Sequence, residues 1–356
     1  MDANRSPRPW LLLGGLGAVI GVAVLAGWPL FDWFVSRVEV PPGSFLVRIH
    51  RWGTDLPAGA TYADAPLLAP DDSYKGILLD EKDGQVTSGE GRFYLNPFFW
   101  SYEIHPMTEV PPDKVLVRTR LYGKPIPAER LAAGDFLARD GERGIVADAW
   151  GPGKYRINPY AYGAKLVDAV KVDAGEVGVM TLKVGNDPTE LPENLRRGPY
   201  VVPDGFRGVQ QKPLSGGTYY VNPYVKSIAR VDTRSHQVEF RDVEFPSRDG
   251  FHIKPQVLVT LRVIEDKAPQ LFVTLSDNGE LPQGYGPADI AKNPILQKVV
   301  LPLVRGYARI EGSKMPARDF IAQSASAAAP GVQEGNAREV LQQKLMEKVA
   351  PACQEL

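Results

Sequence analysis

The residue types that could do chemistry are few and scattered along the chain. There are four histidines, His50, His105, His236 and His252, and one cysteine, Cys353. No GxSxG, HExxH or GxxxxGK[ST] pattern occurs, so the sequence lacks the usual signatures of a nucleophile elbow, a zinc-binding helix or a phosphate loop. A single cysteine also excludes an internal disulfide and a cysteine-based metal cluster. We therefore predict that the protein is not an enzyme and has no catalytic or cofactor-binding residue.

Two groups of residues could in principle bind a metal ion. His236 and His252 flank the Asp249-Gly250 pair, which is typical of a tight hairpin turn, and could face each other across it. A set of acidic residues that could hold a hard cation crowds one loop: Asp71, Asp72, Asp80, Glu81 and Asp83. A surface histidine pair and a solvated acidic loop are the simpler interpretations. We predict no metal site and no cofactor.

The composition favours many short strands in a chain long enough for several domains. Of 356 residues, 44% are apolar, which supports packed cores, and 35 glycines with 32 prolines favour strands joined by turns. The formal net charge of -1 excludes a strongly basic binding surface. Nucleic acid is therefore not an expected partner.

Residues 10–31 are the exception to this globular composition. They carry no charge over 22 positions and would span about 33 Å as a helix, enough to cross a bilayer. We predict a transmembrane helix there, preceded by a tail at 1–9; a cleaved signal peptide is the alternative. Gly17 and Gly21 form a GxxxG pattern that could bring two such helices together.

The arginines that flank this segment bear on its orientation in the membrane. Arg5 and Arg8 precede it, and Arg37 and Arg48 follow it, so the bias in positive charge is small. We expect a single-pass membrane protein with a cytoplasmic amino terminus and most of the chain outside.

An eight-residue pattern occurs three times between the apolar segment and the carboxyl half. It reads GRFYLNPF at 91–98, GKYRINPY at 153–160 and GTYYVNPY at 217–224. Its alternation predicts a strand, and proline ends the strand because it cannot donate to a ladder. The Asn-Pro pairs either only form a turn or also form a surface that binds a peptide. They are Asn96 with Pro97, Asn158 with Pro159, and Asn222 with Pro223.

A second pattern alternates with the first and makes the repeat longer. It reads VEVPPGSFLVRI from Val38, TEVPPDKVLVRT from Thr108 and VKVDAGEVGVMT from Val170, each a strand, turn and strand. We predict β modules at 38–107 and 108–169, and a third inside a larger domain at 170–320. The first two look like duplications of the third.

The order of motifs after Val170 resembles the SPFH or band 7 family, which includes stomatin, prohibitin, flotillin and bacterial regulators of a membrane protease. The motifs are VDAGEVGVMTL, the third octet, VDTRSHQVEF, the Asp249-Gly250 hairpin, VLVTLRV, and Glu265 and Asp266 before a helix. The resemblance covers roughly residues 170–350. It implies an α+β fold with a mixed sheet and helices, anchored in the membrane.

The resemblance also implies a role without catalysis. Family members assemble into rings or cages that organise a membrane microdomain or enclose a membrane protein such as a protease. The expected partners are other copies of the chain or related chains, membrane lipids and a membrane-protein client. The alternative from the residues is a β-module binding protein that faces the cell envelope and does not assemble, with contact loops at 121–140 and 186–204.

The resemblance implies a long carboxyl-terminal coiled coil that holds the ring together, and the last helical segment of this chain departs from that pattern. Residues 336–352 predict one helix, with Leu341, Leu345 and Val349 as a single apolar stripe and Pro351 interrupting it. The stripe is too short for a firm coiled-coil prediction. Its three residues, with Gly17 and Gly21, are the candidate assembly residues.

Overall fold

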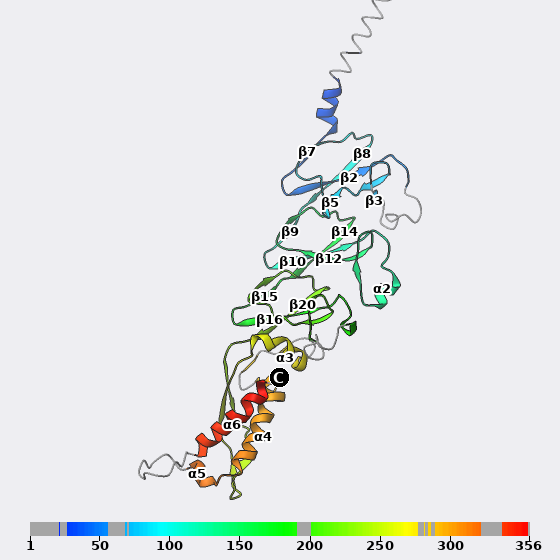
Figure 1. Ribbon diagram of the computed structural model, residues 1–356. Coiled ribbons are helices and arrows are strands. Elements are labelled where there is room, and N and C mark those ends of the chain that lie inside the picture. Colours follow the sequence, from blue (N-terminus) through cyan, green and yellow to red (C-terminus); the bar gives the residue numbers. More distant parts are fainter. Residues whose placement is uncertain are drawn as a thin grey trace, which may run out of the picture. The chain divides into compact units, whose positions relative to one another are not determined.

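The computed structural model describes residues 21, 27–55, 68–69, 71–190, 201–276, 281, 284–285, 289–321 and 337–354 (Figure 1). The fold is mixed α+β, as predicted. The chain forms two compact units, Met1–Ala169 and Val170–Leu356. The second unit starts at the residue where the family resemblance starts.

Most of the predicted transmembrane helix lies outside the described residues, which include Gly21 and 27–31 of that segment. Residues 27–31 are helical. Among the helices that the structure describes, none is long and apolar enough to cross a membrane.

The first β module combines a two-stranded ribbon with a four-stranded sheet. Its ribbon pairs β1 (Arg37–Val40) with β7 (Gly91–Tyr94). Its sheet has the order β3-β4-β2-β8, with β3 at Leu68–Ala69, β4 at Gly76–Leu78, β2 at Ser44–His50 and β8 at Trp100–Pro106. The π-helical turn η1 (Asp32–Ser36) precedes it, and a hairpin of β5 (Glu81–Lys82) and β6 (Gln85–Val86) extends from it.

The second module repeats this arrangement. Its ribbon pairs β9 (Thr108–Val110) with β13 (Gly153–Tyr155). Its sheet has the order β11-β12-β10-β14, with β11 at Leu137–Ala138, β12 at Gly144–Trp150, β10 at Lys114–Arg120 and β14 at Tyr162–Asp168. The short helix α2 (Ala128–Ala132) lies between β10 and β11. Modules 1 and 2 share one hydrophobic core, to which Phe45 and Val86 contribute from module 1 and Leu116 and Tyr162 from module 2.

The third module, at the start of the second unit, has the same strand order. Its ribbon pairs β15 (Val170–Val172) with β19 (Gly217–Tyr219). Its sheet has the order β17-β18-β16-β20, with β17 at Val201–Val202, β18 at Gly208–Gln210, β16 at Glu176–Leu182 and β20 at Lys226–Asp232; the 3-10 turn η2 is at Pro188–Glu190. The repeated sequence patterns therefore correspond to a repeated backbone topology.

The asparagine of each octet makes the same turn. The Oδ1 atoms of Asn96, Asn158 and Asn222 accept a hydrogen bond, each at 3.0 Å, from the backbone N–H two residues later. Each asparagine carbonyl accepts two further backbone hydrogen bonds from the start of the next strand. In each copy of the octet this Asx turn closes the strand end and engages the side-chain oxygen of the asparagine.

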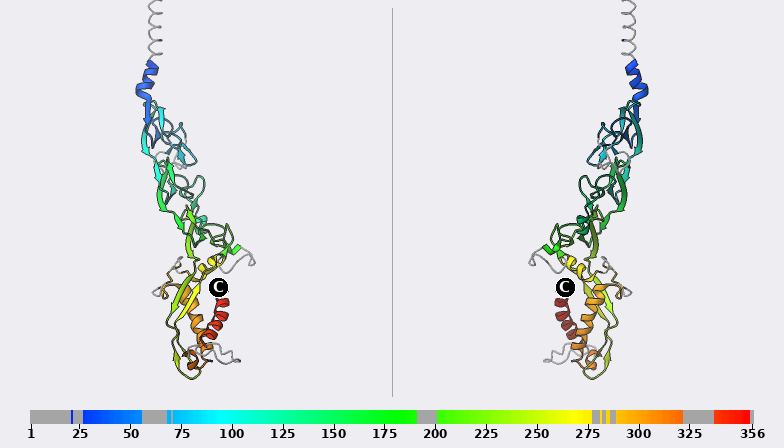
Figure 2. Two further views of the ribbon diagram at one scale, coloured as in Figure 1. Left: turned by 90° about the vertical axis from the view of Figure 1, so that its left-hand side faces the viewer. Right: turned by 90° about the vertical axis from the view of Figure 1, so that its right-hand side faces the viewer.

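The rest of the second unit packs helices beside strand ribbons. The ribbons pair β21 (His236–Phe240) with β24 (Val257–Leu261) and β22 (Phe245–Pro246) with β23 (His252–Ile253). The helical elements are η4 (Glu265–Lys267), α3 (Ala268–Leu275), η5 (Ile295–Val300), α4 (Leu301–Gly312), α5 (Ala317–Ile321) and α6 (Ala337–Gln354). Figure 2 shows α4 and α6 lying side by side.

One face of β24 is partly buried: the alternate residues Val257, Val259 and Leu261 pack against the core, while Leu258 is exposed. The expected interruption at Pro351 is wrong, because α6 continues to Gln354. Proline in the last turn removes only one intrahelical hydrogen bond, so the helix tolerates it there.

Candidate functional site

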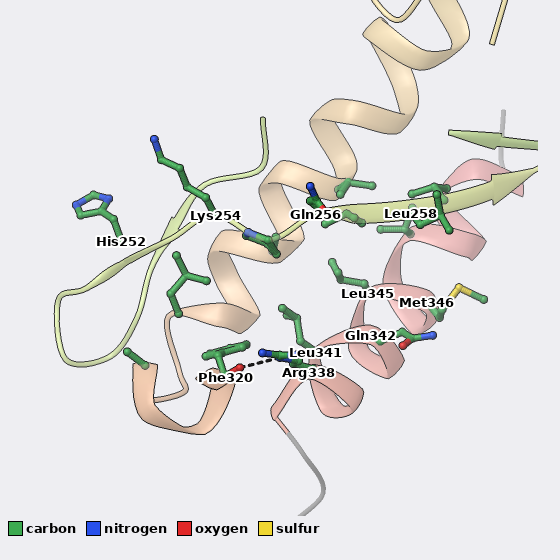
Figure 3. Close-up of a pocket in the computed structure, with 18 of the residues that line it drawn as sticks. His252, Lys254, Gln256, Leu258, Phe320, Arg338, Leu341, Gln342, Leu345 and Met346 are labelled. Carbon is green, nitrogen blue, oxygen red and sulfur yellow. Dashed lines mark hydrogen bonds between the residues drawn. The ribbon is translucent and has the colours of Figure 1, made fainter. Parts of the chain in front are cut away.

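The second unit contains an apolar groove (Figure 3). It has a volume of about 1490 Å³ and lies between β24 and helix α6, with residues of α4 and α5 also lining it. Leu258 on β24 and Met346 on α6 are exposed at its walls, with fractional exposures of 59% and 65%. A groove with exposed apolar walls suits a protein segment better than a small polar ligand.

The walls of the groove are fixed by specific contacts. Asp249, in the β22–β23 turn, accepts a hydrogen bond from the Ala317 N–H at 3.1 Å at the start of α5. Arg338 Nε donates to the Phe320 carbonyl at 2.7 Å, which ties α6 to α5. The groove is therefore part of the folded unit and does not depend on one loose helix.

The apolar stripe of the C-terminal helix lies at this groove. Leu341 is buried, and Leu345 and Val349 are partly buried against the same core. All three line the groove, together with the exposed Met346. The stripe thus packs on its own unit, and the exposed apolar surface beside it belongs to Leu258 and Met346. Of the two glycines proposed for assembly, Gly17 lies outside the described residues. Among the residues that the structure describes, nothing lies within 4 Å of the position that a Cβ on Gly21 would take.

The groove lining contains three cations, Lys254, Arg318 and Arg338, and one carboxylate, Asp249. Lys254 pairs with Glu244 at 3.3 Å and Arg318 with Asp319 at 3.4 Å, outside the lining. The Asp249 carboxylate is already held by the amide of Ala317. An acidic and apolar partner would complement this lining.

The two histidines considered for a metal site do not meet. His236 on β21 lies 3.1 Å from the Asp232 carboxylate and stacks on Tyr285 with ring centroids 3.8 Å apart. His252 on β23 lies 3.1 Å from Glu244. Each imidazole therefore has its own carboxylate neighbour.

The acidic loop is also divided by the fold. Asp71 accepts a hydrogen bond from the Ser73 amide at 2.8 Å, while Asp80 pairs with Arg48. Glu81 turns toward the second module instead. Within the part of the chain that the structure describes, no three histidine, cysteine or acidic side chains are grouped so that they could hold a metal ion.

Glu81 belongs to a buried polar cluster at the joint between modules 1 and 2. Burial raises the pKa of Glu81 to about 7, although a hydrogen bond from Tyr162 and the charges of Arg120 and Arg118 act in the opposite direction. Its Oε1 atom is buried and has no hydrogen-bond partner among the residues that the structure describes. The sequence did not indicate this burial of Glu81, because an acidic residue in a loop of acidic residues is expected to be exposed to solvent.

Two arginines of module 2 complete the joint. The Arg118 guanidinium lies 3.6 Å from the centre of the Trp150 ring and directly against Gly84 in the β5–β6 turn. The Arg156 carbonyl accepts a hydrogen bond from the Val86 N–H at 2.9 Å. The β5–β6 hairpin therefore locks the two modules together.

A comparison with protein families matches the same residues that form the second unit. The model of a family described as SPFH domain / Band 7 family matches residues 170–356, a little over half of the chain. A comparison with curated proteins finds no match.

Proposed function

Because the chain belongs to the SPFH domain / Band 7 family, we propose that it is a membrane-anchored scaffold whose copies assemble into a ring or cage. Such an assembly organises a membrane microdomain, or encloses and regulates a membrane protein such as a protease. The apolar segment at 10–31 supplies the anchor, with the amino terminus in the cytoplasm and the two units outside.

The observation that carries this proposal is the groove between β24 and α6. We take its occupant to be a second copy of the chain, because the second unit also has a surface of complementary character. Ile264 is exposed there and is followed by the exposed acids Glu265 and Asp266, with the exposed Arg262 and Lys267 at the two ends of the group. An exposed apolar side chain followed by two acids matches a groove with apolar walls and cations in its lining.

A contact between two different patches of the same unit has a consequence for symmetry. Such a head-to-tail contact leaves a free groove at one end and a free acidic patch at the other, so it generates a closed ring when the rotation permits. The proposed contact therefore leads to the proposed assembly without a long coiled coil.

The test compares the size of detergent-extracted particles for two single substitutions of the full chain. Met346→Glu places a charge in the groove and should reduce the particle to monomers or small oligomers, measured by light scattering. Ile310→Glu is the matched control, because Ile310 is exposed on α4 but does not line the groove. Particles of unchanged size for Met346→Glu would overturn the groove contact.

A further inference from the structure

Exposed aromatic side chains gather where the chain enters module 1. Phe34, Trp52 and Phe98 have fractional exposures of 76%, 64% and 68%. Trp33 and Phe99 are also exposed. Solvent exposure of so many large rings in one region is costly for a soluble surface and marks an interaction site.

These aromatic residues are held in place. Trp52 Nε1 donates a hydrogen bond to the Phe98 carbonyl at 2.7 Å. The Phe98 ring stacks on Phe31 with centroids 6.4 Å apart, and the Arg37 guanidinium lies 4.4 Å from the centre of a Trp33 ring. These contacts join Phe31, Trp52 and Phe98 and place Arg37 over Trp33. Together with Phe34 and Phe99, their neighbours in the chain, we call these residues the aromatic face: Phe31, Trp33, Phe34, Trp52, Phe98 and Phe99.

The repeat provides an internal control for this face. The patterns RIHRWG and RTRLYG occupy the same place in modules 1 and 2, so Trp52 corresponds to Tyr122. The octets place Phe99 opposite Ala161 in the same comparison. The registers agree, since His50 pairs with Trp100 and Arg120 pairs with Tyr162.

In module 2 the equivalent surface is covered. Tyr122 and Ala161 are 8% and 0% exposed, and both belong to the core shared with module 1. The Tyr160 hydroxyl, at the position of Phe98, donates to Glu103 of module 1 at 2.8 Å. This surface of a module is therefore built to be covered, and in module 1 it carries larger aromatic side chains.

We infer that the aromatic face of module 1 docks on the surface of the lipid bilayer. The face is continuous with helical residues 27–31 and with the apolar segment 10–31 that leads into it. Tryptophan and phenylalanine beside arginine are the side chains expected at headgroup level, where an aromatic body and a charged group are both accommodated. The position of the face beside the predicted membrane segment favours the bilayer as its partner over a second copy of the chain or a client protein.

The inference rests on the proposed membrane attachment and adds to it. The anchor alone would leave module 1 free to pivot on its connecting segment. Contact of the aromatic face with the headgroups fixes the orientation of the first unit relative to the bilayer plane.

Site-directed spin labelling of the full chain tests the inference. The only cysteine is replaced by Cys353→Ser, and single labels are placed by Phe98→Cys on the face, Leu166→Cys on β14 and Val19→Cys in the apolar segment. The protein is reconstituted in vesicles of phosphatidylcholine and phosphatidylglycerol. Collision with oxygen, which concentrates in lipid, is compared with collision with a water-soluble nickel chelate.

The expected result is that the label at 98 collides mainly with oxygen, as the label at 19 does, while the label at 166 collides mainly with nickel. Tyr160→Cys is the matched control: Tyr160 is only partly exposed beside Glu103 of module 1, so a label there should be less accessible to both reagents than the label at 166. The inference is overturned if the label at 98 behaves like that at 166, or is shielded like that at 160, while the label at 19 reports lipid. A label at 19 that reports water would overturn both the docking and the membrane anchor.

Discussion

The joint between modules 1 and 2 should weaken as the pH rises through neutrality, because of Glu81. Its pKa in the folded joint is about 7, above the ordinary glutamate value of 4.5. A carboxyl group with a raised folded-state pKa binds more protons in the folded joint than in the open one. The stability it contributes is therefore present at low pH and is lost between about pH 4.5 and 7.

The size of the effect follows from these two pKa values. With one unit of pKa equal to about 1.36 kcal/mol, proton binding favours the closed joint by roughly 1.4 kcal/mol more at pH 6 than at pH 8. This is an upper value, because Glu81 is only partly shielded from solvent. Groups from both modules face the Glu81 carboxyl and influence its pKa: Asp80 from module 1, and Arg118, Arg120 and Tyr162 from module 2.

Amide hydrogen exchange of Val86 is the assay, since its N–H bonds to the Arg156 carbonyl across the joint. After correction for intrinsic exchange, protection should be up to tenfold higher at pH 6 than at pH 8. Glu81→Gln, a neutral isostere, should remove the pH dependence and keep the higher protection at both values. Asp72→Asn, which changes an exposed acid of the same loop, should leave the pH dependence intact. Equal protection of the unaltered chain at the two pH values would refute the reasoning.

Three further substitutions test the packing. Gly84→Ala should destabilise the first unit by about 1–3 kcal/mol, because Gly84 has φ +75° and its Cβ would collide with the Arg118 guanidinium; an unchanged midpoint of thermal unfolding would contradict this. Asn158→Ala should lower the free energy of unfolding by about 1–3 kcal/mol, because it removes the acceptor of the Tyr160 N–H at a turn where Asn158 itself is buried. Asn96→Ala removes the same acceptor at a less buried turn and should lower it by less in the same denaturant titration. Gly312→Ala should lower the thermal midpoint of the second unit, because its Cβ would meet the Phe245 ring, whereas Gly306→Ala on the same helix has open space and should not.

The local features were predictable because their causes lie within a few residues. The turn at each Asn-Pro pair and the hairpin at Asp249-Gly250 depend on short-range backbone chemistry, and alternation at Val257, Val259 and Leu261 reports one buried face directly. The family resemblance likewise depended on the order of such local motifs. Its match to residues 170–356 confirms the assignment.

Features that depend on distant contacts were not predictable. Glu81 becomes buried only because Arg118 and Tyr162, far along the chain, form the other side of the joint. The stripe of Leu341, Leu345 and Val349 reads as a seam for another helix, but α4 and α6 pack together and draw it toward the core of its own unit. Periodicity shows that a face is covered and does not show what covers it.

The central claim is that copies of the chain assemble into a scaffold, and the mass of the detergent-extracted full-length particle tests it most directly. Light scattering combined with negative-stain imaging should give a closed ring or cage of many copies. A monomer or dimer under the same conditions would contradict the account, and would favour a binding protein that presents its modules without assembling.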